Sequence, residues 1–162
     1  MPASEKDPQS HYLHPGNLFA HKNPHVVTTI LGSCVAVCLW DPVLKIGGIN
    51  HYLLALWNGE GLALPKYGNI AIKNLIDKME QLGSNKRVLK AKVFGGAAMH
   101  QNSSGLLNVG KRNIIVAEDI LAKEGIPTVS SDTGGLIGRR LLFYTETGLV
   151  RMRYIKKSAS GK

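Results

Sequence analysis

The chain has few cysteines, few acidic residues and no long apolar run, and each shortage excludes a class of protein. Only two cysteines occur in 162 residues, so a hydrophobic core rather than a disulfide framework must hold the fold. No run reaches the roughly 18 apolar residues that a membrane-spanning helix needs. The start, MPASEKDPQSHYLHPG, lacks the apolar segment of a signal peptide. We therefore expect a single cytoplasmic domain over residues 1–162, with residues 1–10 and 156–162 flexible.

Acidic side chains are outnumbered by basic ones, 11 to 20, and the net charge is +9. Such an excess is compatible with a nucleic acid, an anionic membrane or an acidic protein as partner. No aromatic RNA-binding motif, zinc finger or basic helix accompanies the basic residues. The composition therefore favours an acidic protein partner, with no nucleic acid bound and no insertion into a membrane.

Short apolar segments with strand-like patterns dominate the chain, and two segments have helical spacing. The first helix is indicated by apolar residues from Ile72 to Leu82, and the second begins after Asn108 or Asn113. We expect the first three strands to form a β-meander. Strands in runs with inserted helices predict an α+β fold, a mixed or mostly antiparallel sandwich-like pair of sheets with two or three helices outside. The expected strands are Val26–Leu31, Cys34–Trp40, Ile46–Leu54, Val88–Phe94, Ile126–Ser130, Arg139–Thr145 and Leu149–Ile155.

The residues from Thr28 to His51 concentrate the types that catalyse acyl transfer. Cys34 directly follows Gly32-Ser33, a tight turn that exposes a thiol and brings backbone N–H groups near it. His51 lies 17 residues later, in a strand expected to neighbour that of Cys34, and histidine is the usual base for a thiol. A hydroxyl or carbonyl of Thr28 can hold the imidazole in one tautomer. These three residues make a candidate catalytic trio.

Ordinary structural roles account for the same residues taken one at a time. A buried cysteine is commonly a small core residue, and Cys38, inside CVAVCLW, is best explained that way. His51 and Thr28 alone are unremarkable strand residues. Spacing by itself leaves both interpretations open.

A resemblance to a known family favours the catalytic interpretation. The string LGSCVAVCLWDP followed by IGGINHYLL closely resembles the chemoreceptor glutamine deamidases of the CheD family. Further similar segments run in matching order from about residue 11 to 155: HYLHPGNLF, KYGNIAIKNLI, AKVFGGAAM, VGKRN, DTGG and GRRLLFYTETGLV. One departure is visible at Leu53–Ala55, where LLA replaces an expected Leu-Pro. It concerns the start of the following loop.

The resemblance implies a protein-glutamine glutaminase with Cys34 as nucleophile, His51 as base and Thr28 as the residue that orients the base. Backbone N–H groups at Ser33 and Cys34 are expected to bind the oxyanion, and Gly95 and Gly96 to allow close approach at the rim of the site. No metal and no organic cofactor are expected. The implied fold is that of the cytotoxic necrotizing factor deamidase toxins.

The implied substrate is the cytoplasmic domain of chemoreceptors, and a CheC-type phosphatase is an implied partner in organisms that have one. The oligomeric state cannot be read from the sequence, and a monomer is the simplest expectation. The alternative is a non-catalytic adaptor that binds this phosphatase and receptors.

Two other chemistries are weaker. Asp132-Thr133-Gly134 resembles an aspartic protease motif but has no second copy, so a glycine turn is expected. His11, His14, His21 and His25 do not form a zinc motif, and His21 and His25 are expected to be solvated.

Overall fold

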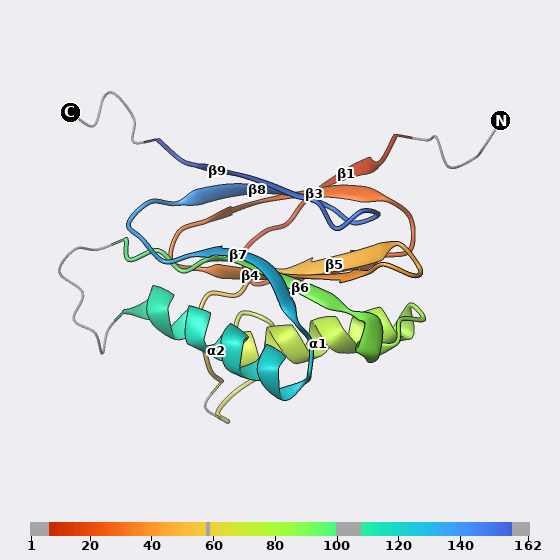
Figure 1. Cartoon of the computed structure of the whole chain (residues 1–162). Coiled ribbons are helices and arrows are strands. Elements are labelled where there is room, and N and C mark those ends of the chain that lie inside the picture. The colour runs from red at the N-terminus through yellow and green to blue at the C-terminus, as the bar shows by residue number, and fades with distance from the viewer. Residues whose placement is uncertain (1–6, 58, 100–107, 157–162) are drawn as a thin grey trace.

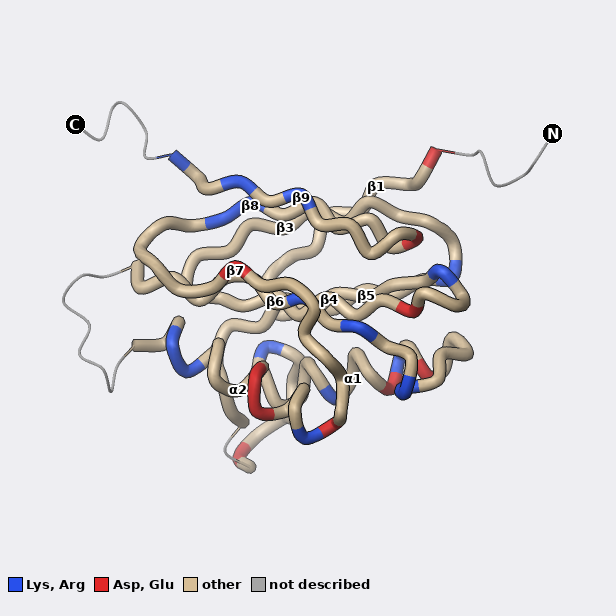
Figure 2. Tube along the Cα trace, in the orientation of Figure 1, with Lys and Arg blue, Asp and Glu red and all other residues tan. Residues whose placement is uncertain are grey.

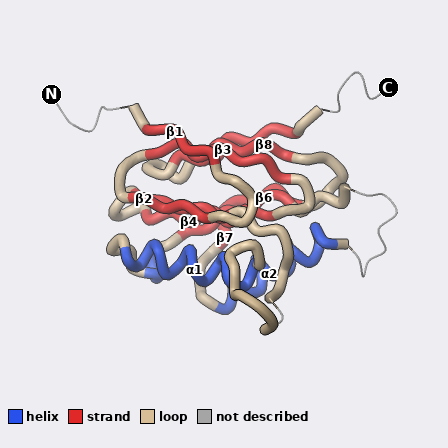
Figure 3. The backbone as a smooth tube through the Cα atoms, turned by 180° about the vertical axis from the view of Figure 1, so that it is seen from behind, coloured by secondary structure: helices blue, strands red, loops and turns tan. Residues whose placement is uncertain are grey.

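The computed structural model describes residues 7–57, 59–99 and 108–156, and stacks two sheets with a layer of helices (Figure 1). The four-stranded sheet has the order β1 (Gln9–Tyr12), β3 (His25–Leu31), β8 (Arg139–Tyr144), β9 (Val150–Tyr154). The five-stranded sheet has the order β2 (Leu18–His21), β5 (Ile46–Asn50), β4 (Val35–Asp41), β6 (Lys90–Gly95), β7 (Thr128–Thr133). Helices α1 (Gly68–Gln81) and α2 (Val109–Lys123) cover the outer face of the second sheet, and a short 3₁₀ helix, η2 (Lys86–Val88), precedes β6. Figure 3 shows the same three layers from behind.

The predicted α+β class is confirmed, including the mixed sheets. The β1–β3 and β6–β7 pairs are parallel and the other paired strands are antiparallel. As expected, β4 and β5 are antiparallel neighbours. The β-meander is wrong, because β3 and β4 belong to different sheets. The turn at 32–34 carries the chain from one sheet to the other. This position makes the turn part of the sandwich edge rather than a hairpin.

The first residues of the chain contribute more structure than their sequence indicated. Gln9 and Ser10 pair with β3, so the expected flexible segment does not extend to residue 10. Residues 1–6 and 157–162 lie outside the described part of the chain. Within that part, no helix is both long and apolar enough to span a bilayer.

Two hydrophobic cores lie on the two faces of the five-stranded sheet, and β4 contributes to both. Val35, Val37 and Leu39 point to the core shared with α1 and α2. Ala36 and Cys38 point to the core between the sheets, since successive residues of a strand face opposite sides. Cys38 is 1% exposed, which confirms its prediction as a core residue. The continuous apolar run CVAVCLW is therefore the pattern of a strand buried on both faces.

The helices follow the predicted apolar spacing. Residues Ala71, Ile72, Leu75, Ile76 and Met79 of α1 are buried against the sheet. Asn108 caps α2 by accepting a hydrogen bond from the Lys111 amide at 3.0 Å. Asn113, the other candidate cap, lies inside α2 and is fully buried. Its side chain is therefore free to contact the segment around Cys34.

Candidate active site

Cys34 and His51 lie on the same face of adjacent chain segments. Val35 and Tyr52 form an isolated antiparallel bridge, with both backbone hydrogen bonds at 3.0–3.2 Å. In this register His51 is opposite Ala36, so Cys34 and His51 are diagonal neighbours. Such neighbours are roughly 7–8 Å apart at the backbone, within reach of a long side chain. Both side chains therefore point to the space between the two sheets, where half-buried Cys34 packs against the core.

A chain of two hydrogen bonds fixes the His51 ring. The hydroxyl of Thr29, on β3, donates to the Leu13 carbonyl at 2.8 Å. The same Oγ1 lies 2.7 Å from His51 Nδ1. A hydroxyl has one proton, so Oγ1 accepts from Nδ1–H, and we infer the tautomer from this. The lone pair is then on Nε2, which is buried without a hydrogen-bond partner among the described residues. His51 is therefore held with its basic nitrogen free.

The sequence had predicted that Thr28 contacts the imidazole of His51. In the structure this contact is made by Thr29. Thr29 is fully buried, whereas Thr28 is partly exposed on the opposite face of β3. The Thr28 carbonyl is also engaged, since it accepts a hydrogen bond from the Leu13 amide at 2.8 Å. Alternation along the strand explains the difference, because a shift of one residue inverts the face. Thr28 has no hydrogen bond to His51 among the described contacts.

All three carbonyls of the Gly32-Ser33-Cys34 turn are held by other segments. The Ala97 amide donates to Gly32 at 3.0 Å and the Gly96 amide to Cys34 at 2.9 Å. Asn113 Nδ2 donates to the Ser33 carbonyl at 3.0 Å. The backbone amides of Ser33 and Cys34 have no acceptor on another described residue, and the Cys34 amide lies against its own thiol. Free N–H groups beside a nucleophile are the arrangement of an oxyanion hole.

Gly95 and Gly96 allow this turn to lie directly against β6. A Cβ on Gly95 would overlap the Cys34 carbonyl oxygen, and its φ of 109° disfavours any other residue. A Cβ on Gly96 would overlap the Ile114 side chain on α2. The structure thus shows close approach of backbone at both glycines, which brings α2 next to the turn.

Asn113 is a site residue that the sequence analysis missed, since it had been considered only as a helix cap. Its Nδ2 also donates to the Leu53 carbonyl at 2.9 Å. One amide group thus joins the turn before β4 to the segment that follows His51. The Tyr52 hydroxyl adds a bond to the Asn113 carbonyl at 2.6 Å. The only sequence signal was a polar residue on the apolar face of α2, between Gly110 and Val116.

Burial controls the charges of His51 and Cys34. It lowers the pKa of His51 from 6.5 to about 4, so the ring is neutral at physiological pH. Burial raises the pKa of the Cys34 thiol, and hydrogen bonding to its own backbone amide opposes this effect. The resting pair is therefore a neutral thiol beside a neutral imidazole. Transfer of the proton to Nε2 would create two opposite charges whose attraction offsets part of their desolvation.

The other candidate chemistries do not converge on a site. His25 is buried, which corrects the expectation that it is solvated, and its ring centroid lies 4.8 Å from those of both Phe19 and His21. The described residues contain no group of three or more His, Cys, Asp or Glu side chains able to hold a metal ion. Asp132 pairs with the buried Arg139 at 2.8 Å, and Gly134 has a φ of 84°. The DTGG segment is therefore the glycine turn that was expected.

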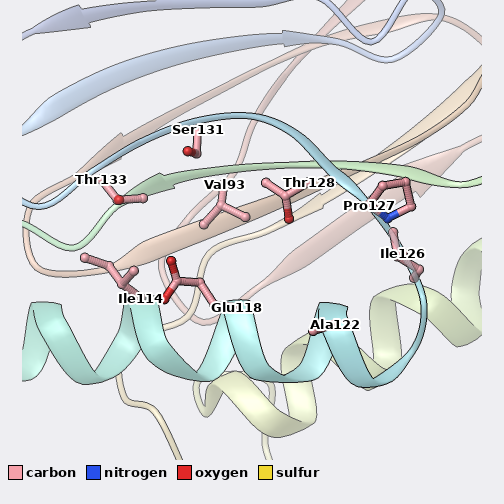
Figure 4. A pocket seen from close by; sticks show the side chains of 9 residues that line it. All are labelled: Val93, Ile114, Glu118, Ala122, Ile126, Pro127, Thr128, Ser131 and Thr133. Carbon is pink, nitrogen blue, oxygen red and sulfur yellow. The ribbon is translucent and has the colours of Figure 1, made fainter.

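A cavity of about 300 Å³ lies between α2 and strands β6 and β7, and Cys34 is not among its lining residues (Figure 4). Glu118 is the only acidic or basic side chain among its lining residues, and no thiol or imidazole reaches it. Its other labelled residues are apolar or carry hydroxyl groups. This cavity lacks the combination of nucleophile and base found at the turn.

The turn and the segment after β5 thus bring a half-buried thiol, an oriented neutral imidazole and two backbone amides to one edge of the sandwich. The family described as CheD chemotactic sensory transduction matches residues 57–154. A Sulfurimonas denitrificans protein named "Probable chemoreceptor glutamine deamidase CheD" is 47% identical over 148 residues, which cover 91% of this chain and 95% of that protein. A Trichlorobacter lovleyi protein of the same name is 46% identical and covers 88% of each. The chain belongs to the CheD family.

Solved structures with similar folds are more distant. A Neisseria meningitidis protein of family DUF152 has a TM-score of 0.48 with 13% identity, covering 79% of this chain and 64% of that one. The Bacillus licheniformis hypothetical protein YfiH has a TM-score of 0.41 with 16% identity, covering 67% of this chain and 49% of that one. The likeness to the cytotoxic necrotizing factor toxins stays a prediction.

The lowered pKa of His51 predicts an acid-sensitive fold. The His51 side chain binds a proton more tightly in the unfolded chain than in the folded protein. The contribution of neutral His51 to the free energy of unfolding is therefore complete above about pH 6.5 and is lost as the pH falls toward about 4. Its size is about 3 kcal/mol at most. Urea unfolding across this range should show a smaller loss of stability for His51→Gln than for the wild type. His14→Asn is the control, because His14 is exposed, and this variant should keep the wild-type profile. Parallel pH profiles of wild type and His51→Gln would contradict the assignment.

Replacing Asn113 should loosen the turn. Asn113→Asp keeps the shape but removes both Nδ2–H donors and places a carboxyl beside the carbonyls of Ser33 and Leu53. We expect a loss of about 1–3 kcal/mol in the free energy of unfolding, measured by urea denaturation. Asn108→Asp is the matched control, since aspartate caps a helix as well as asparagine does. Equal stabilities of the two variants would show that Asn113 does not hold the turn.

Proposed function

We propose that the protein hydrolyses glutamine side chains of chemoreceptors to glutamate, with Cys34 as nucleophile and His51 as base. The observation that carries the proposal is the free, buried Nε2 of His51 on the same face as the Cys34 thiol. The names of the curated relatives supply the substrate, a receptor glutamine. The carboxamide of glutamine suits a neutral thiol–imidazole pair, since the reaction needs only proton transfer and an oxyanion site.

The first half of the reaction forms a thioester. His51 Nε2 takes the thiol proton as Cys34 Sγ attacks the carboxamide carbon. The carbonyl oxygen becomes an oxyanion and accepts hydrogen bonds from the Ser33 and Cys34 amides, whose directions are fixed by the three held carbonyls. The tetrahedral intermediate collapses as Nε2–H donates its proton to the leaving nitrogen. Ammonia departs and the glutamyl thioester remains.

The second half consumes water. His51, again neutral, takes a proton from a water molecule as its oxygen attacks the thioester carbon. Collapse breaks the C–S bond, and the proton returns to the sulfur. The products are a glutamate side chain and the free thiol, with one water consumed for each ammonia released. Thr29 keeps the proton on Nδ1 in both halves, which leaves Nε2 to shuttle the catalytic proton.

Finer proposals accompany this function. We assign the orienting role to Thr29 rather than Thr28, on the hydrogen bonds described above. We also propose that the protein associates with a CheC-type phosphatase, as the family resemblance implies. We further propose that it acts as a monomer in the cytoplasm.

The direct test is mass spectrometry of a chemoreceptor cytoplasmic fragment from the same organism. Wild type should give the mass gain expected when an amide nitrogen is replaced by oxygen, at defined glutamines. Cys34→Ala should give none, and Cys38→Ala is the matched control that should retain activity if it folds. A mass gain with Cys34→Ala would refute the nucleophile, whereas no gain with any protein would favour the adaptor function.

The two neighbouring threonines provide a second test. Thr29→Val removes the hydroxyl that accepts from Nδ1–H, and the ring then samples the wrong tautomer and orientation. We expect kcat to fall by about 10²-fold, the lower end of the contribution of general acid–base catalysis. Thr28→Val, on the outer face of the same strand, should stay within about twofold of wild type. The reverse order of activities would restore the assignment of Thr28.

A further inference from the structure

The outer face of the four-stranded sheet is basic and is not covered by helices. Both helices lie on the five-stranded sheet, at the other side of the molecule (Figure 1). Strands β1, β3, β8 and β9 contain four arginines and no acidic residue. Arg139 is buried and paired with Asp132, which leaves Arg140, Arg151 and Arg153 on the outer face. Figure 2 shows the blue segments along β8 and β9, without red on either strand. This face is therefore an uncompensated positive surface within the described part of the chain.

Arg140 and Arg153 are the centre of this surface. They are direct cross-strand partners in the β8–β9 ladder, and Ile30 of β3 pairs with Arg140. Neither guanidinium has an ion pair or hydrogen bond among the described contacts, unlike Arg139, which binds Asp132. Like charges directly opposite each other destabilise a sheet. A pair kept in this position without a protein counter-ion indicates an anionic partner.

An apolar groove continues this face to the catalytic turn. Its volume is about 450 Å³, and it reaches Gly32, two residues before Cys34. Exposed apolar side chains line it, which is unusual for a free surface. These are Ile30, Met99, Leu136, Ile137, Tyr154 and Ile155, with exposed fractions of 45%, 49%, 61%, 46%, 50% and 39%. The groove therefore extends from Ile30, the cross-strand partner of Arg140, to Gly32 of the turn that carries Cys34.

We propose that an acidic, apolar-faced helical segment of the substrate protein docks across Arg140, Arg153 and this groove, and thereby presents its glutamine to Cys34. The proposal rests on the proposed function and adds the way in which the substrate is recognised. Apolar residues of the segment fill the groove, while its carboxylates bind the two guanidinium groups. Arginine is suited to this role because its planar fork binds carboxylates in a bidentate manner.

The spacing gives the position of the carboxylates. Ile30 is four residues before Cys34, which is at most about 13 Å of extended chain, and Arg140 and Arg153 lie about 5 and 10 Å to the side of Ile30, one and two strands away. An α-helix covers the resulting separation of about 14–16 Å in about nine to eleven residues. We therefore expect acidic residues two to three helical turns from the modified glutamine, on the same face of the segment. This is a specificity rule for sites in the substrate, independent of the chemistry at Cys34.

The test compares two double variants. The arginine variant carries Arg140→Gln and Arg153→Gln. The lysine variant, which is the control, carries Lys78→Gln and Lys123→Gln and removes the same charge from the two helices. With a chemoreceptor cytoplasmic fragment as substrate, we expect the arginine variant to lose about tenfold or more in kcat/KM, through KM, and to show a weaker dependence on salt. With a blocked glutaminyl-glycine dipeptide, too short to reach the arginines, both variants should equal the wild type. Leu136→Asp should reproduce the selective loss, because it places a carboxylate in the groove.

Several outcomes would overturn the docking proposal. They are an unchanged kcat/KM of the arginine variant on the receptor fragment, an equal loss with the lysine variant, and an equal loss on the dipeptide. Binding of the fragment to Cys34→Ala, measured by calorimetry with and without the arginine changes, keeps the two proposals separate. If wild type deamidates nothing but the arginine changes abolish binding, the catalytic proposal fails, and with it the presentation of a glutamine to Cys34, while the binding surface itself stands. Weakened binding to anionic lipid vesicles with unchanged binding to the receptor fragment would also refute it.

Discussion

The site depends on one hydroxyl that connects the two sheets. Thr29 belongs to the four-stranded sheet, His51 follows a strand of the five-stranded sheet, and Leu13 supplies the carbonyl that uses the hydroxyl proton. Thr29 orients the ring and defines its tautomer without adding a buried charge, and the pKa of His51 is low. In the proposed mechanism, a residue without charge would thus take the part that a carboxylate takes in other triads. The base of that mechanism would hold a proton only when a thiolate or intermediate is formed beside it.

Backbone geometry, more than side chains, prepares the proposed oxyanion site. The turn of Cys34 has each carbonyl bound by a different donor, two from the segment after β6 and one from α2. Three held carbonyls leave little freedom to the peptide planes between them, so the Ser33 and Cys34 amides have fixed directions. Such preorganisation requires no rearrangement when negative charge develops. The glycines that follow β6 are necessary for this packing, because a side chain at Gly95 would displace the turn itself.

Much of this was predictable from local patterns, and the exceptions have physical causes. The apolar run of β4 indicated burial on both faces, and its link to β5 indicated that Cys34 and His51 meet. Nothing in the pattern shows which sheet a strand joins, so the crossing at the turn was missed. Thr28 was chosen from its place on the strand before the turn and then from the family resemblance. Burial of Val27 and Leu31 marks the inward phase of β3, and that phase contains Thr29. The role of Asn113 depends on tertiary contacts that helical spacing does not contain.

The two cysteines differ sharply although they lie on the same face of one chain segment. Cys34 is half-buried at the edge of the sandwich, whereas Cys38 is enclosed in the core and its thiol pKa is raised far above the usual value. Alkylation needs a thiol that the reagent can reach and that can lose its proton, and of the two cysteines only Cys34 meets the first condition. At a pH high enough to ionise the Cys34 thiol, a native preparation treated with iodoacetamide should therefore take up one label per folded chain. With Cys34 as the proposed nucleophile, this label titrates the site without any engineered reporter, so rates can be referred to the concentration of functional sites.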